Sequence, residues 1–402
     1  MRKISLLVFM LLVSTLTFSQ WTALTSGTMN YLASVHFPDA NTGYVVGDSG
    51  TILKTINAGT KWNALTSGTQ NYLASVFFTN VDTGYVVGAG GIILKTINGG
   101  DAWTNLSSGT NKNLVSVCFT DRNTGYAVGD SGTILETING GTTWTVLSSG
   151  TPNDLTSIYF PDFNTGYAVG LYGTILKTVN AGTSWTDLTV GSYGSSYVFL
   201  SDYFLNPDSG FVVGGFIGGS GGIWKTIDGG ATWSGESGQS DFYFYSVFCT
   251  NADTVFAIGE AGTVRKTYNE GALWDTLPNG TLNDLHSVFF TNQNTGYAVG
   301  ALGTILKTSN GGGYPEGLNN LSPNSNTLIV YPNPSSDLVT IESSVILTHG
   351  HLSIMNLAGQ EVLAKEDNQP KIRLDISNLP SGVYFVRLIN NGTVEEGKFL
   401  KN

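Results

Sequence analysis

The stretch Thr55-Ile56-Asn57-Ala58-Gly59-Thr60-Lys61-Trp62 recurs along this chain and decides its fold. The pattern Thr-x-Asn/Asp-x-Gly-x-x-Trp places tryptophan at positions 62, 103, 144, 185, 233 and 274, and Trp21 stands one period ahead of the first copy. Successive gaps between these tryptophans, from Trp21 onward, are 41, 41, 41, 41, 48 and 41 residues. A fixed period of this size indicates a solenoid or a propeller.

One repeat contains four short segments with strand character, at 32–37, 43–47, 51–56 and 61–65. Each is rich in β-branched or aromatic residues and is bounded by Gly, Asn or Asp, which is typical of strands. In the last turn the Asn57 side chain can bond nearby backbone N–H groups, and Gly59 accepts a positive φ. Four-stranded antiparallel units repeated radially are propeller blades, so the sequence predicts an all-β propeller.

The number of inner strands predicts seven blades. These strands are expected to begin near Leu32, Leu73, Leu114, Leu155, Phe199, Phe244 and Leu285. The seventh third strand, at 304–308, is not followed by a tryptophan, whereas the segment 21–24 is a surplus outer strand. We therefore predict that the N-terminal segment pairs with the seventh third strand and closes the ring, which leaves no open sheet edge.

Composition and the N-terminus indicate an exported protein. A formal charge of −11 with no basic run argues against nucleic-acid binding. In the segment 1–19, Arg2 and Lys3 precede an apolar run, which is typical of a cleavable secretory signal. A membrane anchor is the alternative, but it needs about 20 apolar residues. The two cysteines, Cys118 and Cys249, lie in different repeats and are interpreted as small buried hydrophobic residues.

The period stops near residue 314, and a second β domain follows. The segment 315–326 is rich in Gly, Asn, Ser and Pro and is predicted to be a linker. New strands are expected at 328–331, 338–343, 351–356, 371–376, 382–389 and 397–400. Short strands with turn signals between them predict a small Ig-like antiparallel sandwich. The predicted division is a signal peptide at 1–19, a propeller at 20–314, the linker, and a tail domain at 327–402.

Two named patterns resemble the repeat. The motif Thr-x-Asn-x-Gly-x-x-Trp is similar to the Asp-box, or bacterial neuraminidase repeat (BNR). The wider unit resembles the repeats of photosystem II stability and assembly factor propellers, over about residues 21–314. This resemblance implies the propeller fold; a fold of this kind supports many activities, so it implies no single one.

The tail resembles a secretion signal of a different kind. The motifs Tyr331-Pro332-Asn333-Pro334, 352–362 and 379–387 together resemble the type A sorting domain of type IX (Por) secretion. The resemblance implies that the signal peptide takes the protein across the inner membrane. Residues 327–402 would engage the type IX machinery at the outer membrane and then be removed. The propeller would be released, or anchored to surface lipopolysaccharide.

The Asp-box similarity raises the possibility of a sialidase, which the arginine content excludes. Sialidases hold the substrate carboxylate with three arginines, and the predicted propeller contains only Arg122 and Arg265. No zinc spacing, phosphate-binding loop or serine elbow is present, so no metal or cofactor is predicted. His36 and His286 lie in inner strands of neighbouring blades. Strand alternation predicts that they point to opposite faces, as core or rim residues.

A glycoside hydrolase that uses two carboxylates remains an alternative. In a propeller, the loops that enter the inner strands share a face with the loops between the second and third strands. The acidic residues expected on this face are Asp48, Asp130, Asp154, Asp241, Glu260 and Asp284. Asp48 and Asp130 occupy the same position in the repeat, which favours a role in a turn over catalysis.

Six lysines also share one repeat position, where the third repeat has Glu136. They are Lys54, Lys95, Lys177, Lys225, Lys266 and Lys307. A ring of cations could bind an acidic partner, whereas the favoured interpretation is a solvated edge of the third strand.

The fifth repeat is 48 residues long instead of 41, with extra residues in 191–197 and 214–222. These loops are expected on one face, where functional residues of a rigid scaffold usually lie. They bring Ile217 and other apolar side chains together. The predicted ligand-binding residues are Tyr172, Tyr193, Tyr197, Phe216, Phe242 and Tyr243. The alternative is that these side chains only pack a longer loop.

The leading functional hypothesis is therefore a secreted or cell-surface, non-catalytic binding propeller for an extracellular glycan or protein. A secreted carbohydrate-active hydrolase is the alternative, and an assembly or scaffold factor like the photosystem proteins is a third.

Overall fold

The computed structural model describes residues 20–189, 196–240, 242–313, 328–343, 350–356, 360–390 and 393–402. The chain divides into two compact units, Met1–Gly313 and Tyr314–Asn402, and each is described by itself. The predicted signal peptide and the predicted linker lie outside the described residues. No helix in the described part is long and apolar enough to cross a membrane.

The described part of the first unit contains seven four-stranded antiparallel sheets, and we number these blades in chain order. Blade 1 consists of β2 (Leu32–His36), β3 (Gly43–Gly47), β4 (Ile52–Thr55) and β5 (Asn63–Leu65). Blade 2 consists of β6 (Leu73–Phe78), β7 (Gly84–Gly88), β8 (Ile93–Thr96) and β9 (Thr104–Leu106). Blade 3 consists of β10 (Leu114–Phe119), β11 (Gly125–Gly129), β12 (Thr133–Thr137) and β13 (Thr145–Leu147). Blade 4 consists of β14 (Leu155–Tyr159), β15 (Gly166–Gly170), β16 (Ile175–Thr178) and β17 (Thr186–Asp187).

The later blades follow the same order. Blade 5 consists of β18 (Tyr197–Phe204), β19 (Gly210–Phe216), β20 (Gly221–Thr226) and β21 (Ser234–Ser240). Blade 6 consists of β22 (Phe244–Cys249), β23 (Val255–Gly259), β24 (Val264–Thr267) and β25 (Asp275–Thr276). Blade 7 consists of β26 (Leu285–Phe290), β27 (Gly296–Gly300), β28 (Ile305–Thr308) and the N-terminal β1 (Thr22–Leu24). Short 3-10 turns join second to third strands at Asp48–Gly50, Ala89–Gly91, Asp130–Gly132, Glu260–Gly262 and Ala301–Gly303.

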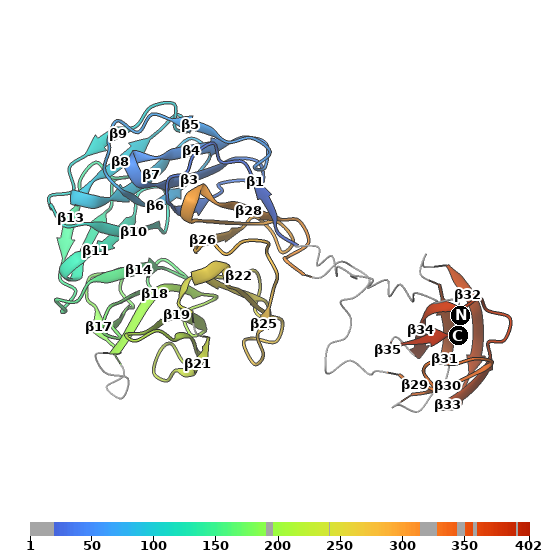
Figure 1. Cartoon of the computed structure of the whole chain (residues 1–402). Helices are drawn as coiled ribbons and strands as arrows, with labels where there is room; N and C mark the ends of the chain where they lie inside the picture. The colour runs from blue at the N-terminus through green and yellow to red at the C-terminus, as the bar shows by residue number, and fades with distance from the viewer. Residues whose placement is uncertain are drawn as a thin grey trace, which may run out of the picture. The chain divides into compact units, whose positions relative to one another are not determined.

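The predicted ring closure is confirmed. Strand β1 pairs antiparallel with β28, with Thr22 opposite Lys307, and Figure 1 shows blue β1 beside orange β28. Trp21 is only 2% exposed and lies edge-on to Phe290, with ring centroids 6.0 Å apart. The N-terminus therefore supplies the outer strand and the tryptophan that the last repeat lacks.

A ring of hydrogen bonds joins the seven inner strands. In each blade the hydroxyl of one serine accepts a backbone N–H from the next inner strand, at 3.2–3.4 Å. The pairs are Ser34 with Val76, Ser75 with Val117, Ser116 with Ile158, Ser157 with Asp202, Ser201 with Val247, Ser246 with Val288, and Ser287 with Val35. The last pair joins blade 7 to blade 1, so the circuit is closed.

The recurring turn is organised by its polar side chains, as predicted. Asn57 Oδ1 accepts the N–H of Lys61 at 2.9 Å, and Thr55 Oγ1 accepts the N–H of Gly59 at 3.0 Å. Gly59 has φ +83°, a conformation that glycine adopts without strain. The turn delivers Trp62 edge-on to Phe37, with ring centroids 6.0 Å apart, and this contact covers the outer end of the blade core.

Cys249 and Val255 explain why the sixth repeat departs from the pattern. In the other repeats a phenylalanine ends the inner strand or directly follows it, and a glycine opens the second strand. At Gly43, a Cβ atom would lie 2.3 Å from the Phe37 ring, so only glycine fits. In blade 6 the smaller Cys249 pairs with Val255 instead. Both cysteines are free and buried.

Two expectations about the inner and fifth-blade strands are wrong. Each inner strand carries a β-bulge near its start, for example between Leu285 and Ser287. The extra residue shifts the alternation, so that His36 and His286 both lie on the partly exposed side instead of on opposite faces. In blade 5 the inner strand begins at Tyr197 instead of Phe199. The segment 214–222 extends the hairpin of β19 and β20, because Gly214 pairs with Gly222 and Gly215 with Gly221, and only residues 217–220 form the turn.

The described part of the tail contains two antiparallel sheets. One contains β29 (Ile329–Tyr331), β30 (Leu338–Glu342) and β33 (Lys371–Asp375). The other contains β32 (Glu361–Asp367), β31 (Gly350–Met355), β34 (Gly382–Asn390) and β35 (Thr393–Lys401). Their core includes Val339, Leu352, Val386 and Phe399. Strand β32 is absent from the sequence prediction, because it is a highly charged edge strand with mostly exposed side chains.

Candidate functional site

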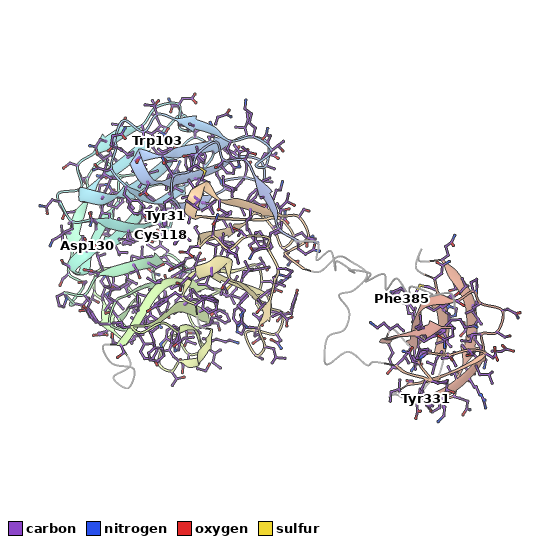
Figure 2. The ribbon with its side chains drawn as sticks, viewed as in Figure 1. Tyr31, Trp103, Cys118, Asp130, Tyr331 and Phe385 are labelled. Carbon is purple, nitrogen blue, oxygen red and sulfur yellow. The ribbon has the colours of Figure 1, made fainter. Side chains whose placement is uncertain are left out.

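Two kinds of connection meet on one face of the propeller, which we call the turn face. It carries the turns between second and third strands and the segments that enter the inner strands. In blade 1, the N–H of Asp48 donates to the carbonyl oxygen of Tyr31 at 2.9 Å and ties these connections together. Figure 2 shows Tyr31 and Cys118 near the centre of the ring and Trp103 nearer its margin. The residues before each inner strand therefore surround the mouth of the central channel.

The structure brings most of the predicted ligand-binding residues together on the turn face. The N–H of Gly173, next to Tyr172, donates to the carbonyl oxygen of Tyr197 at 2.9 Å. The Tyr243 hydroxyl donates to the carbonyl oxygen of Phe216. These contacts connect the blade 4 turn, the blade 5 hairpin and the start of blade 6. Tyr193 lies outside the described residues.

The gathered residues differ in their exposure. Tyr197 is 6% exposed and packs against Phe216, with ring centroids 3.9 Å apart, so it supports the hairpin from inside. Tyr172, Ile217 and Phe242 are 48%, 58% and 42% exposed. We call these three side chains the blade 4–6 patch. Ligand contact by any of the predicted residues remains a prediction.

The predicted carboxylates mostly hold turns in place. Asp154 Oδ1 accepts the N–H of Ser131 at 2.7 Å, and Asp284 Oδ1 accepts the N–H of Ala261 at 2.8 Å. Asp130 Oδ2 accepts from the Asn113 amide at 2.8 Å.

The remaining acidic residues follow a similar pattern. Glu260 Oε2 accepts the N–H of Tyr243 at 3.3 Å. Asp48 begins the blade 1 turn, and Asp241 lies outside the described residues. Four of the five described carboxylates thus take part in hydrogen bonds between or within blades, which favours the interpretation as turn residues.

Sequence analysis missed a strip of aromatic side chains at the channel mouth. The rings of Tyr245 and His286 are stacked with centroids 4.6 Å apart, and the His286 ring lies 4.3 Å from that of Tyr31. Tyr31 lies 6.1 Å from Tyr72, which is 36% exposed. We call these four side chains the channel-mouth strip. It crosses blades 6, 7, 1 and 2 without interruption.

The strip has an electrically neutral surface and an acidic border. Burial lowers the pKa of His286 to about 4, although Asp284 opposes this shift, so the imidazole is neutral at pH 7. Burial raises the pKa of Tyr72 and of Tyr245 to about 12, and nearby carboxylates add to both shifts. Burial and the neighbouring Tyr72 also raise the pKa of Tyr31. Four uncharged π faces therefore lie beside negative charges.

A signal for this strip exists in the repeat itself. Tyr31 and Tyr72 occupy a repeat position that is Asn113, Asp154, Val198, Tyr243 and Asp284 in the other five repeats. Tyr245 and His286 occupy the position two residues later, which is Ala33, Ala74, Val115, Thr156 and Leu200 in the other five. The positions that the blade core requires are nearly identical between repeats, whereas these two vary. A position that varies within a regular repeat is free of packing constraints and can serve a local function.

A second aromatic layer lies deeper in the channel. One inner-strand position supplies His36, Phe77, Cys118, Tyr159, Tyr203, Phe248 and Phe289. The His36 ring lies 4.8 Å from Phe77 and 5.0 Å from Phe289. The Tyr203 ring lies 4.7 Å from Tyr159 and 4.9 Å from Phe248. The rings contact one another around much of the circle, so this layer joins the inner strands of neighbouring blades.

The lysines that share a repeat position clamp neighbouring blades, which neither sequence interpretation anticipated. Lys54 Nζ donates to the carbonyl oxygen of Gly99 at 2.6 Å, and the Tyr44 hydroxyl donates to the same oxygen at 2.8 Å. Lys95, Lys177, Lys266 and Lys307 donate to equivalent carbonyls of the next blade. Lys225 instead pairs with Glu270 at 3.1 Å. The lysine ring is thus part of the scaffold.

Two hollows on the turn face also follow from the repeat. One has a volume of about 810 Å³ and includes Trp103, and the other has a volume of about 740 Å³ and includes Trp62. Their walls consist of the same repeat positions, one period apart. Among the described residues, no group of three or more His, Cys, Asp or Glu side chains is arranged to hold a metal ion.

Two family models match parts of the chain. Residues 329–402 match the secretion system C-terminal sorting domain. Residues 13–111 and 105–193 match the photosynthesis system II assembly factor YCF48. No curated protein shows a significant match.

Solved structures with low sequence identity share the propeller fold. A structure of YCF48 bound to D1 peptide has a TM-score of 0.62 and 18% identity, and the match covers 72% of this chain and 97% of that one. YCF48 from Cyanidioschyzon merolae has a TM-score of 0.61 and 20% identity, with 72% and 98% covered. The GH74 enzyme from Niastella koreensis has a TM-score of 0.61 and 13% identity, with 95% and 74% covered.

At these identities the structural matches establish the fold alone. The sorting domain places the protein outside the cell or on the outer-membrane surface. The chain is therefore a secreted or surface-attached protein that combines a YCF48-like BNR propeller with a C-terminal type IX sorting domain.

Proposed function

We propose that this protein is a non-catalytic binding propeller whose ligand is a segment of another extracellular protein. The observation that carries the proposal is the blade 4–6 patch. Tyr172, Ile217 and Phe242 are large apolar side chains, and each is between 42% and 58% exposed. Clustered apolar surface on a rigid scaffold is typical of protein interaction sites.

The composition of the patch favours a protein segment over a glycan. The Ile217 side chain offers an aliphatic surface with no hydrogen-bonding group, and it lies in the turn between β19 and β20. Apolar side chains of a partner gain burial against such a surface, whereas sugar hydroxyls would lose water there. The structural relative described as bound to D1 peptide provides a precedent for peptide binding by this fold.

A hydrolase is the weaker alternative. The GH74 enzyme shares the fold, but three of the five described carboxylates of the turn face accept backbone N–H groups. Asp154 and Asp284 each accept a backbone N–H of the preceding blade. A catalytic acid needs to be free to donate its proton to a substrate, so these hydrogen bonds argue for scaffold roles.

We also propose that the functional unit is residues 20–314, joined by a linker at 315–326 to the sorting domain at 327–402. In this arrangement the signal peptide and the sorting domain serve export, and the propeller serves binding.

The test is a screen of the exported protein against extracellular-protein and glycan arrays, with reducing-sugar release measured in parallel. We expect specific protein binding without sugar release, and loss of binding when Tyr172, Ile217 and Phe242 are replaced by serine. The matched control is replacement of Phe163 by serine, because Phe163 is also exposed, at 53%, but lies in another blade 4 loop. Sugar release, or binding unaffected by the triple replacement, would overturn the proposal.

A further inference from the structure

We propose that the channel-mouth strip binds arginine side chains of an extended peptide. This inference rests on the proposed function, because it names the chemistry of a partner protein on the same turn face. It concerns Tyr31, Tyr72, Tyr245 and His286, which are separate from the blade 4–6 patch.

The first argument is the geometry of the strip. Its rings follow one another with centroid separations of 4.6, 4.3 and 6.1 Å, from Tyr245 through His286 and Tyr31 to Tyr72. Aromatic faces attract cations through the ring quadrupole, and the planar guanidinium of arginine also stacks on them. Because the strip crosses four blades, it can meet several side chains of one extended segment.

The second argument is charge. Asp48 is close enough to raise the pKa of both Tyr31 and Tyr72, and Glu260 and Asp284 act in the same way on Tyr245. The ionisable groups that act on these four side chains are carboxylates or other strip tyrosines, with Tyr243 beside them. A cationic partner would meet complementary charge at every point of the strip, whereas an anionic partner would be repelled.

The third argument is the state of His286. Its Nε2 atom is buried and has no hydrogen-bond partner among the described residues. A neutral imidazole adds no positive charge to the strip, which suits a guanidinium group. A protonated imidazole would repel it, so the apolar surroundings that keep His286 neutral also keep the strip suited to cations.

The experiment measures fluorescence anisotropy of a labelled Gly-Ser-Arg repeat peptide with the full exported chain. Controls are the same peptide with citrulline, which is planar but neutral, and with lysine. We expect arginine to bind best, lysine more weakly and citrulline least. Replacing Tyr245 by leucine should weaken arginine binding roughly fivefold to tenfold, whereas phenylalanine, which keeps the ring, should retain it. Asp48→Asn should weaken binding and reduce its dependence on salt.

Several results would overturn the inference. Equal binding of the citrulline and arginine peptides would exclude cation recognition, and unchanged binding by Tyr245→Leu would exclude the strip. Competition by neutral oligosaccharides at the same tyrosines would identify a glycan site instead. The outcomes also separate this inference from the proposed function. If binding of a natural protein partner is lost on replacement of the blade 4–6 patch but not of the strip, the proposed function stands and this inference fails. If the arginine peptide binds but no protein partner is found, only this inference stands.

Discussion

Replacing Asp202 by valine should remove a large pH dependence from the stability of the propeller. Asp202 is 4% exposed in the inner strand of blade 5. The equivalent residues of the other repeats are Val35, Val76, Val117, Ile158, Val247 and Val288. Neither carboxylate oxygen makes a well-formed hydrogen bond among the described residues. Burial raises the pKa of Asp202 to about 7, and the Ser157 hydroxyl offsets only part of this shift.

The magnitude follows from proton linkage. The folded pKa is raised from 3.8 to about 7, so the folded state keeps its proton over a range where the unfolded state has lost it. Stability is then greatest below the unfolded pKa and is lost as pH rises through the folded pKa. A shift of about 3 pKa units corresponds to about 4 kcal/mol, at 1.36 kcal/mol per unit.

The assay is denaturant unfolding of the full chain between pH 4 and 8, followed by tryptophan fluorescence. All eight tryptophans lie between Trp21 and Trp274, so the signal reports on the propeller alone. The free energy of unfolding of Asp202→Val should exceed that of the native chain, and this difference should grow by up to about 4 kcal/mol from pH 4 to pH 8. His36 and His286 also titrate, with pKa values lowered to about 4, but they cancel in the difference.

Asp202→Asn separates charge from polarity. It should abolish the same pH dependence while leaving the protein less stable than the valine variant, because a buried amide still lacks partners. A stability difference between Asp202→Val and the native chain that stays constant from pH 4 to 8 would refute the reasoning.

Three further predictions concern the scaffold, and each is measured by thermal or denaturant unfolding. Trp21→Ala should lower the free energy of unfolding by about 3–5 kcal/mol, because it leaves a cavity where the Trp21 ring packs against Phe290 in blade 7. A melting temperature changed by less than about 2 °C would contradict this. Glu136→Lys should raise stability by about 1 kcal/mol by completing the lysine clamp onto the carbonyl of Ala181, and no gain would mean that the clamps contribute little. Cys249→Phe should destabilise the protein through a clash with Val255, and adding Val255→Gly should rescue it, with a coupling of about 2 kcal/mol; additive effects would exclude the pairing.

The blades and their closure could be predicted because the same requirement recurs in every repeat. The glycine that opens a second strand fits under a phenylalanine of its own blade, as Gly43 does under Phe37. The recurring Thr-x-Asn-x-Gly turn is held by its own side chains. Local rules of this kind are visible in sequence, and the count of tryptophans then identified 21–24 as the missing outer strand.

The departures arose from features that a strand pattern does not encode. A one-residue bulge near the start of each inner strand puts His36 and His286 on the same side, whereas strict alternation predicted opposite faces. The extra residues of the segment 214–222 lengthened the β19–β20 hairpin instead of forming a loop, because Gly214 pairs with Gly222 and Gly215 with Gly221. The lysine clamps depend on where a neighbouring blade places its turn carbonyls.

The candidate site was only partly predictable for the same reason. The blade 4–6 patch was visible as an insertion in one repeat. The channel-mouth strip is assembled from single residues of four blades. The sequence did not show that Tyr31 and Tyr72 lie in line with His286, because blades 1 and 7 become neighbours only when the ring closes. Comparing repeats position by position, rather than searching for insertions, would have identified both the strip and Asp202.

The most direct test of the central claim is the dissociation constant of the extracellular partner for the native protein and for the Tyr172→Ser, Ile217→Ser, Phe242→Ser variant. The account predicts tight, specific binding by the native protein, a loss of at least about tenfold in the variant, and no chemical change in the partner. Equal affinity of both proteins, or turnover of the bound molecule, would contradict it.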